Sequence, residues 1–313
     1  MHMHIRRFLL RAVQGACVWL VAATSASATE YAFSTYGLGS AAFGAGVTPP
    51  PGTYVTEAAY FYSANIGATV SFGGITLNPG ATIDAFAAAT NILYVPQRKV
   101  LGGNLGLAVT LPVGHIDIEA TLGGPLGLSR STDGWGFGDV TSRAQLGWQH
   151  GEFSHLVYVQ AVAPTGRWQR GFSPIIGLHR PGIDTGWAFT WTDRTKKLQL
   201  NGSTGVTFNF ENTATDYKSG DEFHLEWAAG LEFAPGLMIG VVGYDYRQIS
   251  DDSGAGARIG PFRGRVDAVG PGLTYTTLFG QSPFILNVRH YTEFNAHNRW
   301  EGNSTIVSGT LRF

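Results

Sequence analysis

Alternation of apolar and polar residues with a period of two is the feature that most restricts the fold of this chain. In residues 221–233, apolar side chains occupy the odd positions from 223 onward, whereas the even positions include Glu222, His224 and Glu226. Successive side chains of a β-strand point to opposite faces, so this pattern predicts a strand with one apolar and one polar face. The same period recurs in residues 139–149, 198–211 and 284–295.

Less regular segments bring the expected number of strands to twelve. The full set is 53–66, 81–95, 103–118, 139–149, 153–164, 184–192, 198–211, 221–233, 237–250, 263–277, 284–295 and 303–313. Long connections (67–80, 119–138, 165–183, 212–220, 251–262 and 296–302) alternate with short ones (96–102, 150–152, 193–197, 234–236 and 278–282). This alternation is typical of a membrane barrel with outer loops and periplasmic turns. The predicted fold is an all-β, transmembrane, antiparallel β-barrel of about twelve strands, with both termini in the periplasm.

The low charge of the chain supports a membrane barrel. Charged residues make up 14% of the 313 residues, against roughly 25% in an average soluble protein. No mature stretch reads as a membrane helix, and only a closed barrel would then leave no backbone group unpaired in lipid. The formal net charge of −1, without a basic cluster, argues against a nucleic-acid partner.

The N-terminal residues 1–28 have the three zones of a secretory signal peptide. Arginines precede an apolar run over residues 12–23, and small residues at 26–28 predict cleavage near Ala28. The apolar run is shorter than the roughly 20 residues of a membrane helix. Cys17 is the only cysteine, so the mature protein is expected to have no disulfide. These features predict export to the bacterial outer membrane.

Residues 29–52 form a segment rich in glycine and proline before the barrel, which we assign to residues 53–313. Apolar residues among the glycines favour a plug that folds into the lumen, and a periplasmic tail is the alternative. At the other end, the final strand finishes on Phe313, a terminal aromatic residue that the barrel-insertion machinery is expected to recognise.

A set of polar residues is expected on the inward strand faces, as a ligand path or as pairs that stiffen the interior. They are Glu57, Arg143, Gln160, Glu222, His224, Glu226, Arg247, Arg265, Asp267, Arg289 and Glu293. The histidines show no metal-ligand spacing, and neither a metal nor a cofactor is expected.

Three prolines interrupt or end the expected strands. Pro112 and Pro271 lie within strands and Pro164 ends one. Because proline cannot donate to a strand ladder, each requires a bulge or a local break. We hypothesise that Pro112 or Pro271 opens a gap through which a hydrophobic compound leaves sideways into lipid; the alternative is a bulge without a transport role.

Tryptophans near strand ends are typical of the aromatic girdles of membrane barrels. Aromatic residues of the outer loops could instead capture an aromatic ligand, and Trp168 and Phe172 are the candidates for that role.

Several short phrases occur in order along residues 33–313. They are Pro49–Tyr54, Leu101–Gly106, Gly136–Asp139, Ala163–Arg167, Thr215–Gly220, Glu222–His224, Asp251–Asp252 and Gly270–Gly272. Together they resemble the family described as involved in the meta-pathway of phenol degradation, a group of outer-membrane transporters. The resemblance implies a barrel and the passage of aromatic or other hydrophobic compounds, and it implies no particular binding residues.

The leading hypothesis is an outer-membrane channel, not an enzyme, for passive uptake of small hydrophobic or aromatic compounds. Its expected partners are outer-membrane lipid, the export and barrel-insertion machinery, and the ligand. One alternative is a lipid hydrolase, which requires a serine or threonine beside a histidine and an orienting polar residue near the lipid interface, and His290 falls on an outward face. A structural surface barrel is the other. The sequence leaves the substrate, the pore radius and the oligomeric state open.

Overall fold

The computed structural model describes residues 29–313 except 73, 122–127, 174–175, 259 and 261–262. The predicted signal peptide lies outside the described residues. The described chain begins with a single short turn, η1 (Glu30–Ala32), and continues in strands. No helix in this part of the chain is long and apolar enough to cross a membrane.

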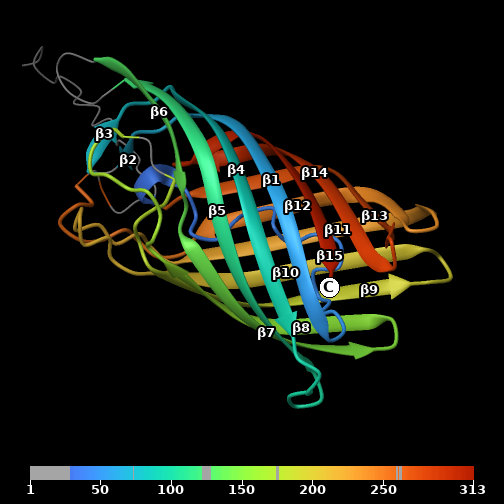
Figure 1. Cartoon of the computed structure of the whole chain (residues 1–313). Helices are drawn as coiled ribbons and strands as arrows, with labels where there is room; N and C mark the ends of the chain where they lie inside the picture. The colour runs from blue at the N-terminus through green and yellow to red at the C-terminus, as the bar shows by residue number, and fades with distance from the viewer. Residues whose placement is uncertain (1–28, 73, 122–127, 174–175, 259, 261–262) are drawn as a thin grey trace, which may run out of the picture.

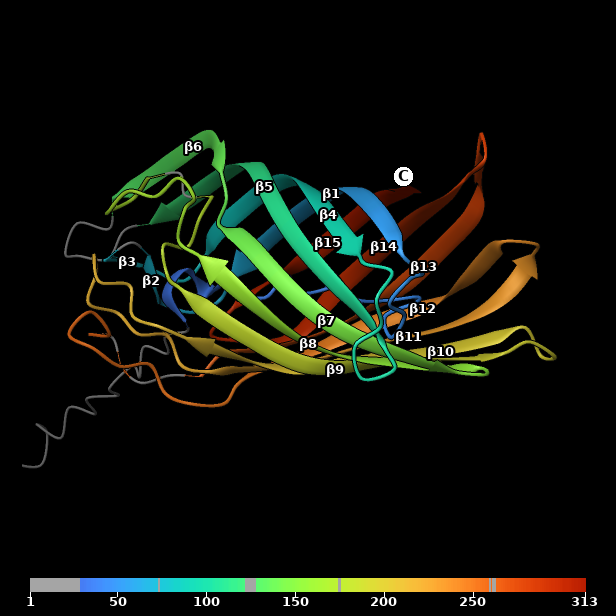
Figure 2. The same cartoon turned by 60° about the horizontal axis from the view of Figure 1, so that its bottom comes forward.

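Twelve antiparallel strands close into a barrel (Figures 1 and 2), which confirms the predicted fold. The barrel strands are β1 (Gly52–Ile66), β4 (Ala81–Val95), β5 (Asn104–Thr121), β7 (Val140–His150), β8 (Phe153–Ala163), β9 (Gly182–Asp193), β10 (Leu198–Asn209), β11 (Glu222–Ala234), β12 (Leu237–Gln248), β13 (Arg265–Phe279), β14 (Ser282–His297) and β15 (Trp300–Arg312). Neighbours in sequence pair throughout, and β1 pairs with both β4 and β15 to complete the ring. Because the sheet closes on itself, the backbone N–H and C=O groups of its strands can all be hydrogen-bonded within the sheet, as the water-free interior of a bilayer requires.

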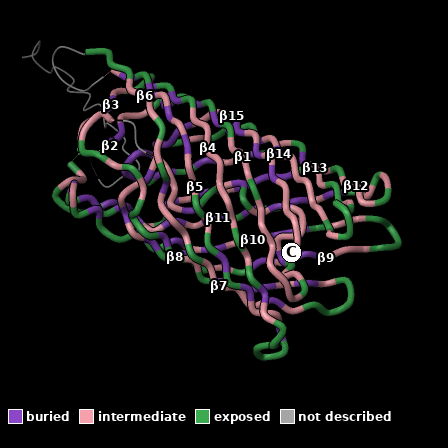
Figure 3. Tube along the Cα trace, in the orientation of Figure 1, coloured by how far each residue is buried: buried purple, intermediate pink, exposed green. Residues whose placement is uncertain are grey.

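Inward and outward side chains alternate along the strands, as the sequence period predicts. Figure 3 shows this as alternating buried and exposed positions on the trace. Exposed large apolar side chains cover the outer surface, among them Phe61, Leu111, Val157, Trp187 and Trp227. On the outside of a membrane barrel, such side chains form the apolar band that faces lipid.

Two of the long connections contain strands that the sequence did not predict. β2 (Val70–Phe72) and β3 (Ile75–Leu77) form a small hairpin, and β6 (Ser129–Phe137) extends the wall beside the half of β5 at the long-loop end. The expectation of a plain loop over residues 119–138 was wrong, because glycines at 134 and 136 take the inward positions and weaken the polar signal.

The core of the molecule lies inside the barrel and is built together with residues 29–48, which we call the interior segment. At the long-loop end, Tyr31 packs with Phe72 and Trp300 in one buried cluster. Nearer the middle, Ala42 packs with Tyr244 in a second cluster. The segment before β1 is therefore part of the folded barrel.

The start of β1 and the end of β15 lie at the same end of the barrel, where Phe313 N donates to Thr53 O at 2.8 Å. This is the end with the short turns (Figure 1). The interior segment runs back through the lumen from there, so that Thr29 lies at the long-loop end beside Tyr246. Which end faces the periplasm stays a prediction from loop length.

Candidate functional site: the lumen cavity

The interior segment is held against the barrel wall by hydrogen bonds from its own backbone. The amides of Gly39 and Ala41 both donate to the Glu226 carboxylate, with 2.7 Å between Gly39 N and Oε1. On the same turn, the Arg289 guanidinium donates to Ser40 O at 2.9 Å. These bonds satisfy backbone groups that would otherwise be buried unpaired at a cost in free energy. One carboxylate and one guanidinium thus fix this turn.

Two glycines of the segment approach β9 and β10 closely. Gly44 N donates to Asn201 Oδ1 at 2.9 Å, and Gly46 N donates to Thr190 Oγ1 at 3.0 Å. A Cβ atom on Gly46 would lie 2.4 Å from the backbone of Phe189. Only glycine permits this approach, which gives the glycine-rich composition of the segment a physical reason.

At the long-loop end, Arg180 fixes the start of the interior segment. Its fully buried side chain donates to Phe33 O, to Glu30 O at 3.1 Å and to Ser219 Oγ at 2.8 Å. Glu222 Oε1 lies 3.5 Å from its Nη2 and supplies the opposite charge. A buried guanidinium needs both partners and charge pairing. Sequence reasoning missed Arg180, because it lies in a connection and no local pattern marks it.

Glu30 belongs to the same buried cluster. Its Oε2 accepts a hydrogen bond from Asn212 Nδ2 at 3.0 Å, whereas Oε1 has no hydrogen-bond partner among the described residues. Burial raises the pKa of Glu30 from its ordinary 4.5 to about 7. This carboxyl group therefore changes its charge near neutral pH.

His224 lies beneath the interior segment and does not face open space. Its Nε2 is 3.0 Å from Asp184 Oδ1, which also accepts a hydrogen bond from Thr207 Oγ1 at 2.8 Å. The Tyr36 ring stacks on the imidazole, with 3.7 Å between ring centroids. The predicted polar face of β11 thus holds the segment in place.

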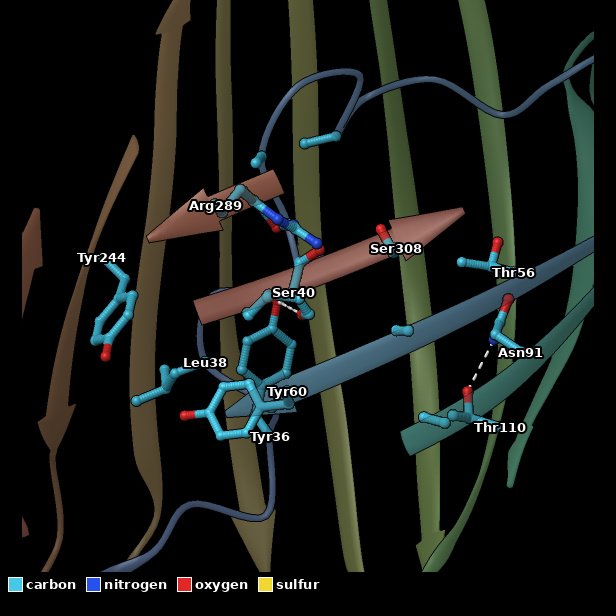
Figure 4. Close-up of a pocket in the computed structure, with 18 of the residues that line it drawn as sticks. Tyr36, Leu38, Ser40, Thr56, Tyr60, Asn91, Thr110, Tyr244, Arg289 and Ser308 are labelled. Carbon is cyan, nitrogen blue, oxygen red and sulfur yellow. Dashed lines mark hydrogen bonds between the residues drawn. The ribbon is translucent and has the colours of Figure 1, made fainter. Parts of the chain in front are cut away.

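A cavity of about 690 Å³ lies between the interior segment and the wall opposite to it. Its lining comes from the segment and from β1, β4, β5, β7, β8, β14 and β15, with small contributions elsewhere. Figure 4 shows Arg289 beside Ser40, and the hydrogen-bonded pair Asn91–Thr110 on the far wall. On β1, β4, β5 and β15, seven of the twelve lining side chains are alanine, serine or threonine, so on this side the space is wide because these residues are small.

Seven of the polar residues predicted to face inward do so. They are Arg143, Gln160, Glu222, His224, Glu226, Arg289 and Glu293, and of these Arg143, Gln160, Arg289 and Glu293 line the cavity. Glu293 accepts hydrogen bonds from Tyr62, Tyr244 and Gly302, at 2.7 to 2.9 Å.

Four residues predicted to face inward point outward instead: Glu57, Arg247, Arg265 and Asp267. On β12, Tyr244 and Tyr246 take the buried inner positions, which places Arg247 on the outer face with Asp267 at 3.0 Å. The error arose because charged side chains were assumed to point inward. Near the ends of strands, outside the lipid band, the outer face also meets water.

Glu57 is the exception to this explanation. Its strand neighbours Thr56 and Ala58 line the cavity, so its carboxylate lies on the outer face, where Thr90 Oγ1 donates to it at 2.9 Å. The apolar residues Val55 and Phe61 flank it along the same face of β1. The hydrogen bond from β4 offsets part of the cost of this position.

The three prolines lie where the ladder changes. β5 pairs with β7 up to Thr110, and beyond Pro112 it pairs with β6 from Val113, while its ladder with β4 runs on without interruption. Pro271 pairs with β12 but has no partner in β14, whose ladder with β13 skips from Val269 to Gly272. Pro164 follows the last residue of β8. Pro112 and Pro271 thus each interrupt one ladder and leave the other intact.

The two loop aromatics pack against the interior segment and its neighbours. Trp168 Nε1 donates to the Tyr31 hydroxyl, and Phe172 lies 5.9 Å from Phe72 between ring centroids. Both are partly buried around the same apolar cluster. In this arrangement they hold the start of the segment, and their predicted role in ligand capture stays untested.

One histidine on the outer face has a hydroxyl neighbour, as the hydrolase alternative requires. His290 Nδ1 lies 2.9 Å from Thr305 Oγ1. Among the described residues, no side chain is bonded to the other ring nitrogen to orient the imidazole. The pair therefore lacks the third group on which an activated nucleophile relies.

Comparison with known proteins places the chain in a family. Residues 61–308 match the family described as "Putative MetA-pathway of phenol degradation". No match was found among curated proteins. The crystal structure of the COG4313 outer membrane channel from Pseudomonas putida F1 is similar, with a TM-score of 0.66 and 15% identity over 86% of this chain and 98% of that one. The translocator domain of the autotransporter NalP from Neisseria meningitidis has a TM-score of 0.47 and 12% identity, over 85% of this chain and 90% of that one.

The family match covers most of the barrel, in agreement with the resemblance of the short sequence phrases. The structural likeness to the COG4313 channel extends over nearly the whole of that protein and supports the same fold. The chain therefore belongs to the family related to the MetA-pathway of phenol degradation, and its barrel has the fold of an outer-membrane channel.

Proposed function

We propose that this barrel is a passive channel of the bacterial outer membrane for small hydrophobic or aromatic compounds. The observation that carries the proposal is the cavity of about 690 Å³, which has the size and the mixed apolar and hydroxyl lining of a small-molecule site. Membership in a family related to phenol degradation supports the aromatic class. Passive uptake needs neither an energy source nor a cofactor, since the shape and polarity of the cavity select the compound.

A compound in this cavity needs an exit. The interior segment follows the lumen from the short-turn end to the long-loop end, which supports its predicted role as a plug of the axial path. The interrupted ladders at Pro112 and Pro271 support a sideways exit into lipid. Pro112 is the better candidate, because there β5 leaves β7 altogether.

A large side chain introduced on the wall of the cavity tests the proposed channel, because it would fill the space that the compound needs. Ala89 lines the cavity on β4, whereas Ala88 points outward on the same strand. We expect cells that produce the protein to take up phenol and benzoate faster than cells without it, and Ala89→Trp to lower the added rate at least tenfold. Ala88→Trp, the matched control, should leave the rate unchanged. Equal rates in cells with and without the protein would refute the channel.

Deletion of residues 30–48 tests the plug separately. Loss of a plug predicts a higher conductance and faster swelling of proteoliposomes in small sugars. An unchanged conductance in a correctly folded deletion variant would show that the segment does not close the axial path.

The hydrolase alternative has its own test, because one pair satisfies its first requirement. If His290 and Thr305 formed a catalytic pair, the purified protein would release fatty acid from phospholipid, and Thr305→Val would abolish the release. We expect no release from either protein, and unchanged uptake in Thr305→Val.

A further inference from the structure

We propose that the cavity is selective for amphiphilic carboxylates, with the carboxylate bound by Arg143 and the apolar body lying along the small side chains of β1, β4 and β5. The inference rests on the proposed channel function and names the chemical class of ligand that the cavity accepts. It is carried by the guanidinium groups, by the bonding of the nearby carboxylates and by the apolar wall.

The arginines that line the cavity have most of their donors unused. Arg143, Arg289 and Arg299 all contribute to its lining, and together their side chains donate one hydrogen bond within the described residues, from Arg289 to Ser40 O. None of the three forms an ion pair with a described carboxylate. Each guanidinium has five N–H donors, and buried donors and charges are costly when unpaired. The described lining of the cavity therefore has three guanidinium groups against one carboxylate, Glu293, and most of their hydrogen-bond donors are unused.

Arg143 is the group best placed to bind a carboxylate. Its guanidinium stacks on the Tyr158 ring, with Cζ 3.8 Å from the centroid, which fixes its plane. The two Nη atoms have no partner among the described residues and keep access to the cavity, whereas Nε is buried. A guanidinium held in this way presents its edge for a bidentate contact with a carboxylate.

Gln160 supplies a second donor next to Arg143. The two residues are direct cross-strand partners on β7 and β8, and such pairs have their Cβ atoms roughly 5 Å apart. The Gln160 side chain forms no hydrogen bond within the described part of the chain and also lines the cavity. An amide and a guanidinium side by side can donate to both oxygens of one carboxylate.

The acidic residues nearby form their hydrogen bonds with other groups and not with Arg143. Glu293 is the carboxylate among the described lining residues, and it already accepts hydrogen bonds from two tyrosines and one backbone amide. Asp184, the cross-strand partner of Gln160 on β9, is 1% exposed and absent from the lining; its Oδ1 is bonded to His224 and Thr207, and its buried Oδ2 has no hydrogen-bond partner among the described residues. Glu226 is occupied by the backbone of the interior segment.

The rest of the cavity suits an apolar body. Ala58, Ala89, Leu93 and Ala108 form its wall on β1, β4 and β5, and Leu38 and Phe43 of the interior segment face it. A purely inorganic anion would leave this surface without contact. A purely apolar compound would leave the guanidinium donors unpaired. A molecule with a single carboxylate on an aromatic or aliphatic body satisfies both.

Binding of three matched compounds to the full chain in lipid nanodiscs tests the inference. At pH 8, 4-phenylbutyrate is an anion, 4-phenylbutanamide is neutral with nearly the same shape, and 4-phenylbutan-1-amine is a cation. We expect calorimetry to show that the carboxylate binds at least about tenfold tighter than the amide, as expected for a charge-assisted bidentate contact, and that the amine binds weakest.

Variants connect the preference to one residue. Arg143→Gln should bring the affinity for the carboxylate down to that for the amide, and Arg143→Lys should keep part of the preference. Arg263→Gln is the matched control, because Arg263 is exposed and paired with Asp251 at the surface. Migration of boiled and unboiled protein in a gel checks that each variant is folded.

The outcomes separate this inference from the channel itself. Equal binding of carboxylate and amide, with both lost in Ala89→Trp, would overturn the carboxylate preference and leave the cavity in place. A preference that persists in folded Arg143→Gln would also overturn the assignment. Absence of binding by all three compounds would count against the cavity and the preference together.

Discussion

Strands β9 to β11 hold the interior segment with Thr190, Asn201 and Glu226, whereas more than half of the side chains with which β15, β1, β4 and β5 face it across the cavity are alanine, serine or threonine. Both halves of the wall have the same alternating pattern and the same outer band of apolar side chains. They differ in the length and hydrogen bonding of the inward side chains. One half of the barrel therefore supports the interior segment, and the other half has short inward side chains that leave space for the cavity.

The largest effect is expected from the guanidinium that joins the segment to the supporting half. Arg180→Ala removes the donors to Glu30 O and Phe33 O and leaves Glu222 buried without its cation. Loss of one partner of a buried ion pair costs about 3–5 kcal/mol. We expect faster hydrogen exchange at residues 30–35 and a lower melting temperature.

Arg263→Ala provides the comparison, since its surface ion pair with Asp251 is worth at most about 1 kcal/mol. If both variants exchanged at the same rate in residues 30–35, Arg180 would not be the anchor of the segment.

The next effect depends on pH and concerns the same anchor. The pKa of Glu30 is about 7 with the segment in place and near 4.5 when it is released, so bound protons favour the docked state. Docking is strongest below pH 4.5, weakens as the pH rises through 7 and is constant above that. The change is on the order of 3 kcal/mol.

Glu30→Gln should remove this dependence and raise the protection factors of the amides of residues 31–35 at pH 8 to their values at pH 5, after correction for the intrinsic pH dependence of amide exchange. Hydrogen exchange of both proteins at the two pH values gives the measurement. An equal pH dependence in the variant would assign it to a different group.

The smallest effect compares one substitution in the two halves. Ala228 is 2% exposed and packs in the cluster with Tyr244, whereas Ala58 faces the cavity. Ala228→Leu overpacks the supporting half and should cost about 1–3 kcal/mol of stability. Ala58→Leu has room for its side chain and should change the melting temperature little. Equal losses in thermal unfolding would mean that the two halves are packed alike.

The sequence predicted the strands well because a closed sheet imposes its period on every residue it contains. The run from Phe223 to Phe233 needs only local alternation to be recognised as a strand, and the long and short connections follow from the two ends of a barrel. The same local rule failed for Glu57 and Arg247, since it identifies two faces without saying which one points inward. That choice depends on the neighbouring positions, such as Tyr244 and Tyr246, which fill the interior.

The candidate site was predictable only in part. Arg143, Gln160 and Arg289 were found because they occupy polar positions in regular strands, and the structure brings them to one cavity. The cavity itself depends on the course of the interior segment, which has no period. Arg180 and Glu30, which fix that course, are far apart in sequence and meet only in the folded chain.

The course of the interior segment also bears on assembly. A segment that runs through a closed barrel from one end to the other must either be threaded through it end-first or already be in place when the barrel closes. The groups that bind it on β9 to β11 and on β14 lie on strands that pair with one another in sequence order and do not depend on the pairing of β1 with β15. The order of events that avoids threading is therefore that the interior segment docks on this sheet first and that β1 pairs with β15 last. The docked segment would then set the curvature of the sheet before it closes.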